Sequence, residues 1–369
     1  MPTQTHRTFA YTHDPISFDF TQSVERFYVE ELPLFEASGR GEWLLLTLRK
    51  KETSTYRLLS ILKAATGAED REIGYAGLKD KSATAVQRIT LPRRYEKALA
   101  NLKTDRIEIL KRERNHKALR IGALAGNRFR ILLTRLSAAD APRFVEAFER
   151  IGQEGFPNRF GYQRFGTDAE SWRQGQELAR SGKRLRGAKE RLLLAAWQSR
   201  LFNRWLDERV RISAILRDCD PSEARRRLQW PAELIEELRA QRQFFKLFLG
   251  ESMGEYPRPK SWRACPDTAA CARDFARKKS VPGGLLPGDR VARAQADARH
   301  LEAPWDDDEI AGVAGGRRPA WVWPEALEHR YDPARREMEV SFTLPPGAYA
   351  TSLLEEIARR ELRPVTDKR

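Results

Sequence analysis

Strand-length apolar runs occur near both ends of the chain, and a long segment with helical periodicity separates them. Residues 43–48 and 129–133 have the length and composition of strands. Residues 338–343 alternate between apolar and polar side chains, which predicts a further strand close to the C-terminus. Residues 192–210 carry apolar side chains at helical spacing. We therefore predict an α+β fold in which a helix-rich middle part interrupts a mixed sheet.

Other elements are predicted from capping residues and composition. Residues 55–65 have helical spacing, with Ser54 placed to cap the start of the helix and Gly67 to end it. A further helix is expected over residues 231–249. Residues 250–292 are rich in proline and glycine, so we predict turns and irregular backbone there. The length of 369 residues suggests two domains, or one domain with a large insertion.

The chain carries a large excess of positive charge. It has 67 Lys and Arg against 52 Asp and Glu, so its formal net charge at pH 7 is +15. This charge favours a polyanionic partner, either nucleic acid or a membrane surface, although a basic surface without a specific partner also fits. Separate basic runs, rather than one amphipathic helix, favour nucleic acid. The runs are Lys111, Arg112, Arg114, Lys117 and Arg120; Lys183, Arg184, Arg186, Lys189 and Arg191; and Arg225, Arg226 and Arg227.

Several classes of protein are disfavoured by motifs that the sequence lacks. No run approaches the roughly 20 apolar residues that span a membrane, and Met1–Ala10 has no signal-peptide core. We therefore expect a soluble, cytoplasmic protein. The three cysteines and five histidines show no metal-ligand spacing, so we predict no metal site and free thiols. Glycine motifs that bind nucleotides or dinucleotides are absent, and no cofactor is indicated.

One loop places a carboxylate between two ammonium groups. Asp80 stands between Lys79 and Lys81, shortly after a predicted strand at residues 73–76. The two cations would favour the ionised form of Asp80 and lower its pKa, which suits a carboxylate nucleophile. A surface turn with a solvated cluster of charges fits the same spacing.

A second loop mixes aromatic, amide and arginine side chains between glycines. Residues 157–166 have the sequence PNRFGYQRFG. Aromatic rings can stack on a base, while amides and guanidinium groups can hydrogen-bond its edge. The alternative is a domain junction whose two phenylalanines fill a core.

Together, these loops resemble signatures of the TruD-type pseudouridine synthases. Gly77–Lys81, with Ala83 and Gln87, is similar to the nucleophile loop of that family, and 158–166 is similar to its second signature. Further similar blocks follow the family order and span most of the chain outside 210–320, where the similarity is only general. These blocks are 27–31 with 38–42, 122–129, and 342–351.

The resemblance implies an RNA uridine isomerase that needs no cofactor and no metal. Such an enzyme breaks the N-glycosidic bond of uracil, rotates the base and rejoins it through carbon. Asp80 would be the nucleophile, attacking either the ribose or the uracil ring. The other residues implied are Phe27, Asn158, Phe160 and Tyr349 as substrate contacts, with Phe160 as the stacking ring, and Lys79 as a support for charge balance or phosphate contact.

The resemblance also implies a domain plan and a substrate. A mixed-sheet catalytic domain would comprise residues 1–167 and 321–369, and a helix-rich inserted domain would comprise 168–320. The partner would be a tRNA, modified at uridine 13 in the D-arm, and no membrane or obligate protein partner is indicated. A catalytically silent RNA-binding protein of the same fold is the main alternative. A DNA-binding protein would need a recognition-helix motif, which the sequence does not show.

Overall fold

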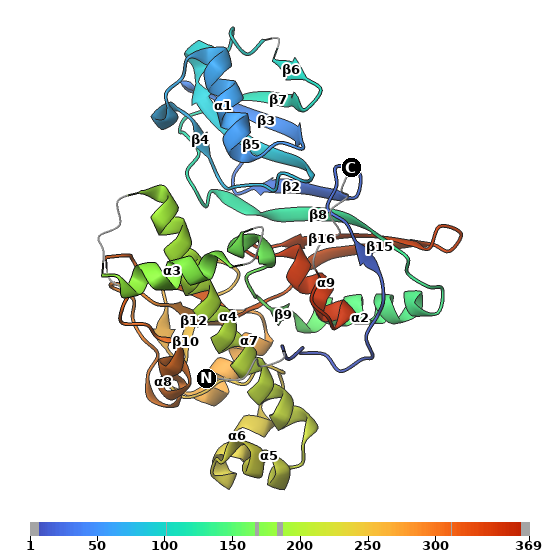
Figure 1. Ribbon diagram of the computed structural model, residues 1–369, viewed down its shortest axis with the longest axis vertical. Coiled ribbons are helices and arrows are strands. Elements are labelled where there is room, and N and C mark those ends of the chain that lie inside the picture. The colour runs from blue at the N-terminus through green and yellow to red at the C-terminus, as the bar shows by residue number, and fades with distance from the viewer. Residues whose placement is uncertain (1–6, 101, 167–169, 183–186, 311, 363–369) are drawn as a thin grey trace. The chain divides into compact units, whose positions relative to one another are not determined.

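The computed structural model describes residues 7–100, 102–166, 170–182, 187–310 and 312–362. The chain forms two compact units (Figure 1). Unit 1 contains the described residues of 1–15, 153–323 and 348–361, and unit 2 contains those of 16–152, 324–347 and 362–369. Each unit is therefore assembled from segments that lie far apart in the sequence.

Unit 2 is built on a mixed sheet of ten strands. The strands are β1 (Asp19–Phe20), β2 (Phe27–Pro33), β3 (Trp43–Lys51), β4 (Gly74–Tyr75), β5 (Thr84–Pro92), β6 (Lys103–Thr104), β7 (Ile107–Asn115), β8 (Leu124–Thr134), β15 (Glu325–Asp332) and β16 (Glu337–Leu344). The main path runs β15-β16-β8-β2-β5-β3-β7-β6, with β1 paired to β8 and β4 to β5. Only β2 and β5 pair in parallel; the other pairs are antiparallel. The strand predicted at 338–343 is confirmed, and it joins strands from the first part of the chain.

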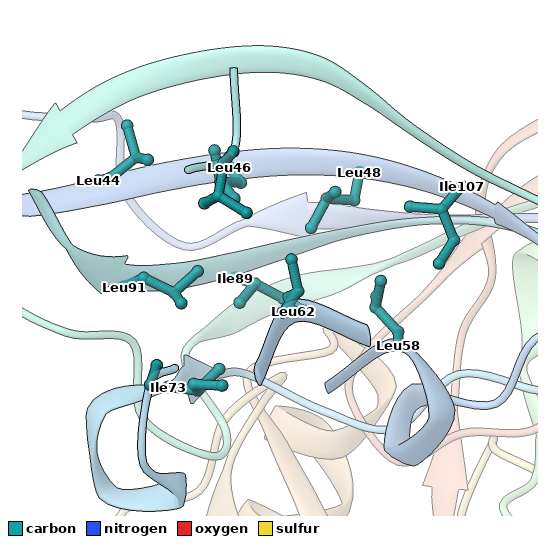
Figure 2. Packing of buried hydrophobic residues seen from close by; sticks show 11 residues of the cluster. Leu44, Leu46, Leu48, Leu58, Leu62, Ile73, Ile89, Leu91 and Ile107 are labelled. Carbon is teal, nitrogen blue, oxygen red and sulfur yellow. The ribbon is translucent and has the colours of Figure 1, made fainter. Parts of the chain in front are cut away.

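Helix α1 (Thr55–Thr66) packs against β3 and β5. Ser54 accepts a hydrogen bond from the backbone N–H of Arg57, and Gly67 ends the helix with a φ of 75°, so both predicted caps are confirmed. Leu58 and Leu62 of the helix face buried side chains of the strands (Figure 2). The other members labelled there are Leu44, Leu46, Leu48, Ile73, Ile89, Leu91 and Ile107. This core fixes the register of β3 beneath the helix.

Helix α2 (Asp140–Glu154) is anchored to the sheet of unit 2 by aromatic contacts. Ser137 Oγ accepts a hydrogen bond from the backbone N–H of Asp140 at 3.0 Å and so caps the start of the helix. The ring of Phe148 lies 6.0 Å from that of Phe342 on β16, and the ring of Phe144 lies 6.1 Å from that of Phe148. The aromatic row therefore connects this helix to the C-terminal strand.

Unit 1 is organised around the long helix α4 (Ala188–Asp218), which confirms and extends the helix predicted at 192–210. Its other helices are α3 (Ser171–Arg180), α5 (Pro221–Leu228), α6 (Ala232–Ala240), α7 (Thr268–Ala276), α8 (Ala296–Glu302) and α9 (Ala350–Ala358). Its strands are β9 (Phe156–Pro157), β10 (Ser252–Glu255), β11 (Arg263–Ala264), β12 (Ser280–Leu286), β13 (Gly316–Pro319) and β14 (Trp321–Val322). They form one sheet in the order β11-β10-β12-β13 and one pair, β14-β9. The described residues also contain short 3-10 turns at Asp70–Glu72, Arg93–Tyr95, Tyr162–Phe165 and Ala303–Trp305.

The helix expected over 231–249 is shorter than predicted. Helix α6 ends at Ala240, and the following backbone is held by side chains. Lys246 Nζ donates to the carbonyl oxygens of Gln241 at 2.6 Å and Gln243 at 2.9 Å. These bonds satisfy carbonyl groups that a continuing helix would have used, so the chain turns here instead.

Residues 250–292 are more regular than predicted, because they contain three strands and helix α7. Strand β12 runs through Gly283 and Gly284, where a Cβ atom would collide with the rings of Trp262 and Trp205, respectively. The glycines therefore allow aromatic rings to pack directly on the strand. The prediction of irregular backbone was wrong because it took these glycines as turn residues.

Cys265 and Cys271 are joined in a disulfide, whereas Cys219 is free. The expectation of free thiols was therefore wrong for the first two. The turn that leads into α7 brings their Cα atoms to 6.3 Å, a separation that a disulfide spans.

The predicted α+β class with a mixed sheet is confirmed. The functional division at residues 168 and 320 stays a prediction. Among the described residues, no helix is both long and apolar enough to cross a membrane.

Candidate functional site

Asp80 lies in unit 2, in the loop between β4 and β5. Its side chain is half-buried, and none of the described residues donates a hydrogen bond to its carboxylate oxygens. Lys81 is exposed, while Lys79 is turned inward. The loop is therefore not the freely solvated turn that its spacing also allowed.

A buried lysine that the sequence analysis did not identify holds this loop. Lys50, near the end of β3, is 0% exposed. Its Nζ donates to the carbonyl oxygens of Thr53 at 2.5 Å, Lys79 at 3.3 Å and Asp80 at 2.8 Å. An ammonium group has three N–H donors, and each has a carbonyl acceptor here. Lys50 therefore fixes the backbone of the loop at Lys79 and Asp80.

The charges of this group are set by burial more than by ion pairing. Loss of hydration raises the pKa of Asp80, and the positive charges of Lys50 and Lys79 oppose that rise without reversing it. The predicted lowering of this pKa was therefore wrong in sign. Burial also lowers the pKa of Lys50 to about 8, against the attraction of Asp80. At neutral pH Lys50 is mostly protonated and favours the ionised form of Asp80.

Lys79 is engaged in a buried ion pair. Its Nζ lies 2.9 Å from Glu31 Oε2 on β2, and the two side chains are 5% and 1% exposed. The backbone N–H of Lys79 donates to Thr55 Oγ1 at 3.0 Å, and the Thr55 hydroxyl donates to Gln87 Oε1 at 3.1 Å. This geometry fits a role for Lys79 in charge balance. Contact of Lys79 with a phosphate stays a prediction.

Phe27 is part of the core of unit 2. Its side chain is 2% exposed, and its ring lies 5.9 Å from Phe20 and 6.1 Å from Phe129. This packing gives Phe27 a structural role. Its assignment as a substrate contact stays a prediction.

Asn158, Phe160 and Tyr349 lie together in unit 1. The half-buried ring of Phe160 meets the rings of Phe202 and Tyr349 edge to face, at centroid distances of 5.5 and 6.1 Å. Asn203 on α4 fixes the backbone of Phe160, because its Oδ1 accepts from the N–H at 2.9 Å and its Nδ2 donates to the carbonyl at 3.0 Å. The structure thus holds the ring in a fixed place with part of its surface exposed.

Arg318 on β13 connects these three residues. Its guanidinium carbon lies 4.0 Å from the centroid of the Phe160 ring and 5.8 Å from that of Tyr349. Its Nη2 donates to Asn158 Oδ1 at 2.8 Å, and its Nε donates to the Asn158 carbonyl at 3.0 Å. Burial lowers the pKa of Arg318 to about 10, which leaves it charged at neutral pH. A lysine could not make both the planar stacking contact and the forked hydrogen bonds.

The amide of Asn158 is hydrogen-bonded to the protein through both its oxygen and its nitrogen. Besides accepting from Arg318, it donates from Nδ2 to the carbonyl of Pro319 at 2.9 Å. Phe165, at the other end of the same loop, is buried, so filling of the core applies to that ring and not to Phe160. A Cβ on Gly161 would lie 2.9 Å from Tyr349, so only glycine allows this approach.

Arg159 anchors the residues before Phe160 to two helices. Its Nη1 lies 2.8 Å from Glu356 Oε1 on α9, and its Nε lies 2.7 Å from Asp207 Oδ1 on α4. Glu356 also accepts from the backbone N–H of Ala10 at 2.8 Å. Burial raises the pKa of Glu356, with Arg159 opposing the rise.

Two functional candidates, Lys50 and Arg318, were missed by sequence reasoning. A signal for Lys50 exists, because Leu44, Leu46 and Leu48 alternate on the buried face of β3 and position 50 continues that face. Arg318 lies in a run of two glycines, two arginines and a proline, which shows no periodicity that would place it in a core.

The described basic runs lie at the surface. The first is exposed on β7 and the residues after it, and the third is exposed on α5. Lys183, Arg184 and Arg186 of the second run lie outside the described residues. Within the described part of the chain, no three His, Cys, Asp or Glu residues are grouped so that they could hold a metal ion.

The sequence model of the family described as "tRNA pseudouridine synthase D (TruD)" matches residues 5–182. A curated protein named tRNA pseudouridine synthase D from Wolinella succinogenes is 42% identical over 359 residues, which cover 97% of this chain and 99% of that protein. A second protein of that name, from Nitratiruptor, is 41% identical with the same coverage. The chain belongs to the tRNA pseudouridine synthase D family. The family resemblance drawn from the sequence is thereby confirmed.

A solved structure supports the fold of this family member. The structure is that of a protein described as a tRNA pseudouridine synthase D from Methanosarcina mazei. It matches with a TM-score of 0.68 at 18% sequence identity and covers 95% of this chain and 96% of that chain. At this identity the likeness shows the shared fold.

Replacing Lys50 with methionine is expected to raise the pKa of Asp80 further. The change removes the positive charge that most strongly opposes the rise in the pKa of Asp80, while the carboxylate stays buried, so protonation becomes easier. A rise of one unit would correspond to about 1.4 kcal/mol of lost interaction with the ionised form. The measurement is an NMR titration of aspartate carboxyl carbons, with Asp80→Asn used to assign the signal.

Lys50→Arg serves as the matched control, because it keeps the positive charge at the same position. Its Asp80 signal should titrate closer to that of the unsubstituted protein. Equal titration curves for the methionine variant and the unsubstituted protein would show that Lys50 does not control the charge of Asp80.

Proposed function

We propose that this protein isomerises uridine to pseudouridine in tRNA. It is an enzyme of a family whose curated members carry that activity in their name and align with it over nearly their whole length. In this reaction the bond from ribose to N1 of uracil breaks and a bond from ribose to C5 forms. The C5 proton leaves and N1 gains a proton, so the product is an isomer of the substrate. The reaction balances without an oxidant or a reductant.

Asp80 is the proposed nucleophile. The observation that carries this assignment is a half-buried carboxylate to which none of the described residues donates a hydrogen bond, beside an ammonium group that is itself buried. A carboxylate whose lone pairs are not engaged by donors is free to attack, and a raised pKa makes it a stronger nucleophile once it is ionised. The same carboxylate can attack either the ribose or the uracil ring.

The base must leave its stack before it can react, and Phe160 is the proposed platform for it. The ring is held by Phe202, Tyr349 and Arg318, so a stacked base would meet a surface that is already ordered. Tyr349 and Asn158 are proposed as further substrate contacts. Asn158 is 2% exposed, so its surroundings would have to open for the amide to reach the substrate. Phe27 would take part only if the core around it opened.

The finer substrate assignment rests on the family resemblance. We propose uridine 13 in the D-arm of tRNA as the target, and the cytoplasm as the place of action. The net charge of +15 supports binding of an extended phosphate backbone. We propose that the enzyme acts on tRNA without an obligate protein partner.

A catalytically silent RNA-binding protein would keep the aromatic group without needing the buried lysine. Burying an ammonium group is costly unless carbonyl or carboxylate oxygens replace its hydration. Lys50 is buried in this way where it fixes the backbone of Asp80. A costly buried charge that holds this one loop favours an enzyme over a protein that only binds RNA.

Asp80→Asn is expected to bind tRNA and to form no detectable pseudouridine. The amide keeps the shape of the side chain but cannot act as an anionic nucleophile. Nucleoside analysis of tRNA after incubation with the purified variant measures the product, and a binding assay on the same preparation checks the complex. Robust turnover by this variant would remove Asp80 from the role of nucleophile.

Phe160→Ala separates stacking from core packing. Base stacking is worth roughly 1–3 kcal/mol, whereas truncation of a fully buried Phe costs about 3–5 kcal/mol of stability. Because the ring is half-buried, we expect a loss of turnover or affinity with a small change in thermal midpoint. Phe160→Tyr keeps the stacking face and should keep most of the activity. A strongly destabilised alanine variant with near-normal turnover would contradict the platform assignment.

A further inference from the structure

A groove of about 690 Å³ lies in unit 1 between the end of α6 and one face of α7. Small side chains on α7 form its floor, including Ala269, Ala272 and Ala276. Two arginines, Arg273 and Arg277, line it from the same helix. None of the residues of the Asp80 loop or of the Phe160 group lines this groove.

Three arginines meet at the groove without a carboxylate partner. Arg242 lines it from the segment after α6, opposite Arg273 and Arg277 of α7. All three side chains are exposed, and among the described residues none of their guanidinium groups forms an ion pair. Glu237 is the one carboxylate in the lining, and it forms no ion pair with them. The groove therefore carries an excess of positive charge.

A bound anion would relieve repulsion among these arginines. Arg273 and Arg277 are four residues apart, and like charges at that spacing repel each other along a helix. The C-terminal ends of α6 and α7 favour cations nearby, so a bound anion would be held by the guanidinium groups and not by the helix ends. Phosphate oxygens accept from two of these donors at once.

The wall that carries Arg242 is held in position by buried polar contacts. Gln241 Nε2 donates to the carbonyl of Leu247 at 2.8 Å, and Lys246 Nζ donates to the carbonyl of Gln241 at 2.6 Å. Arg242 is thus presented from an ordered segment. An ordered wall lowers the conformational entropy lost when a ligand binds.

We propose that this groove binds phosphate groups of a tRNA segment other than the one that is modified. The inference rests on the proposed function in taking RNA as the partner. Alanine side chains let the ribose–phosphate backbone approach closely, and arginines at the rim contact its phosphates without reading the sequence. The groove would extend the RNA contact beyond the reacting uridine and so favour a whole tRNA over an isolated arm.

The test compares two double variants that lose the same charge. Arg273→Ala/Arg277→Ala removes the two guanidinium groups on α7. Arg226→Ala/Arg227→Ala removes two from α5, where both contact Glu223, so a carboxylate already compensates their charge. Binding of full-length tRNA is measured over a series of salt concentrations. We expect roughly tenfold weaker binding for the α7 variant and a salt slope reduced by about two, with at most a twofold change for the α5 variant.

The same binding measurement is made with a short RNA hairpin that carries only the modified arm of the tRNA. It should bind the α7 variant and the unsubstituted protein equally, and turnover at saturating tRNA should be unchanged. Equal losses in both double variants would reduce the effect to net charge and overturn the proposal, as would unchanged binding by the α7 variant.

Two further measurements separate the role of the guanidinium groups from that of charge alone, and the role of the groove from the proposed function. Arg273→Lys/Arg277→Lys keeps the charge and the helix but loses the forked guanidinium donors, so partial weakening of tRNA binding is expected. Binding equal to that of the unsubstituted protein would contradict recognition of phosphate by these guanidinium groups. If the unsubstituted protein formed no pseudouridine, the proposed function would fail, while the binding comparison would still decide the role of the groove.

Discussion

The ammonium group of Lys50 is the interaction on which the nucleophile loop depends. It lies at the end of a strand whose alternate residues pack under α1, so the same register that buries Leu46 and Leu48 also buries this lysine. Away from water, the charge is compensated by three carbonyl oxygens, two of which belong to Lys79 and Asp80. The hydrophobic core thus determines where the charge lies, and the charge determines the backbone of the loop.

Unit 1 uses a buried guanidinium group in the same way, with a different geometry. Arg318 is 8% exposed and combines a stacked contact to Phe160 with hydrogen bonds to the side chain and the carbonyl of Asn158. Its planar fork connects an aromatic face to an amide, which an ammonium group could not do. In both units, a buried cation orders backbone or side chains that belong to a candidate functional group.

Much of the fold could be predicted because the signals are local. The caps at Ser54 and Gly67 and the period-two pattern of β16 depend on a few neighbouring residues, and the structure confirms them. The segment 250–292 was misjudged because the meaning of a glycine depends on what packs against it. At Gly283, a tryptophan ring from elsewhere in the chain replaces the missing side chain.

The residues of the candidate site also differ in whether local sequence signals could identify them. Asp80 and the Phe160 loop carry recognisable local patterns, whereas Lys50 and Arg318 matter only through contacts made in three dimensions. The direction of the pKa shift at Asp80 could not be predicted either. The sequence shows the flanking lysines, but it does not show the loss of hydration on burial. Lys79 illustrates the difference: it stands next to Asp80 in the chain, yet its ammonium group pairs with Glu31.

A raised pKa at Asp80 is compatible with a role as nucleophile as long as the carboxylate is still ionised at neutral pH. An ordinary aspartic acid has a pKa about three units below neutral pH, so burial can raise the value substantially before the ionised fraction at pH 7 falls. Within that range, the rise strengthens the nucleophile, since a more basic carboxylate donates its electrons more readily. The nearby charge of Lys50 opposes the rise and so limits the extent of protonation. Its own pKa of about 8 means that this control persists through neutral pH, where the lysine still carries its proton. Burial and the lysine therefore act in opposite directions on the pKa of one carboxylate, and burial has the larger effect.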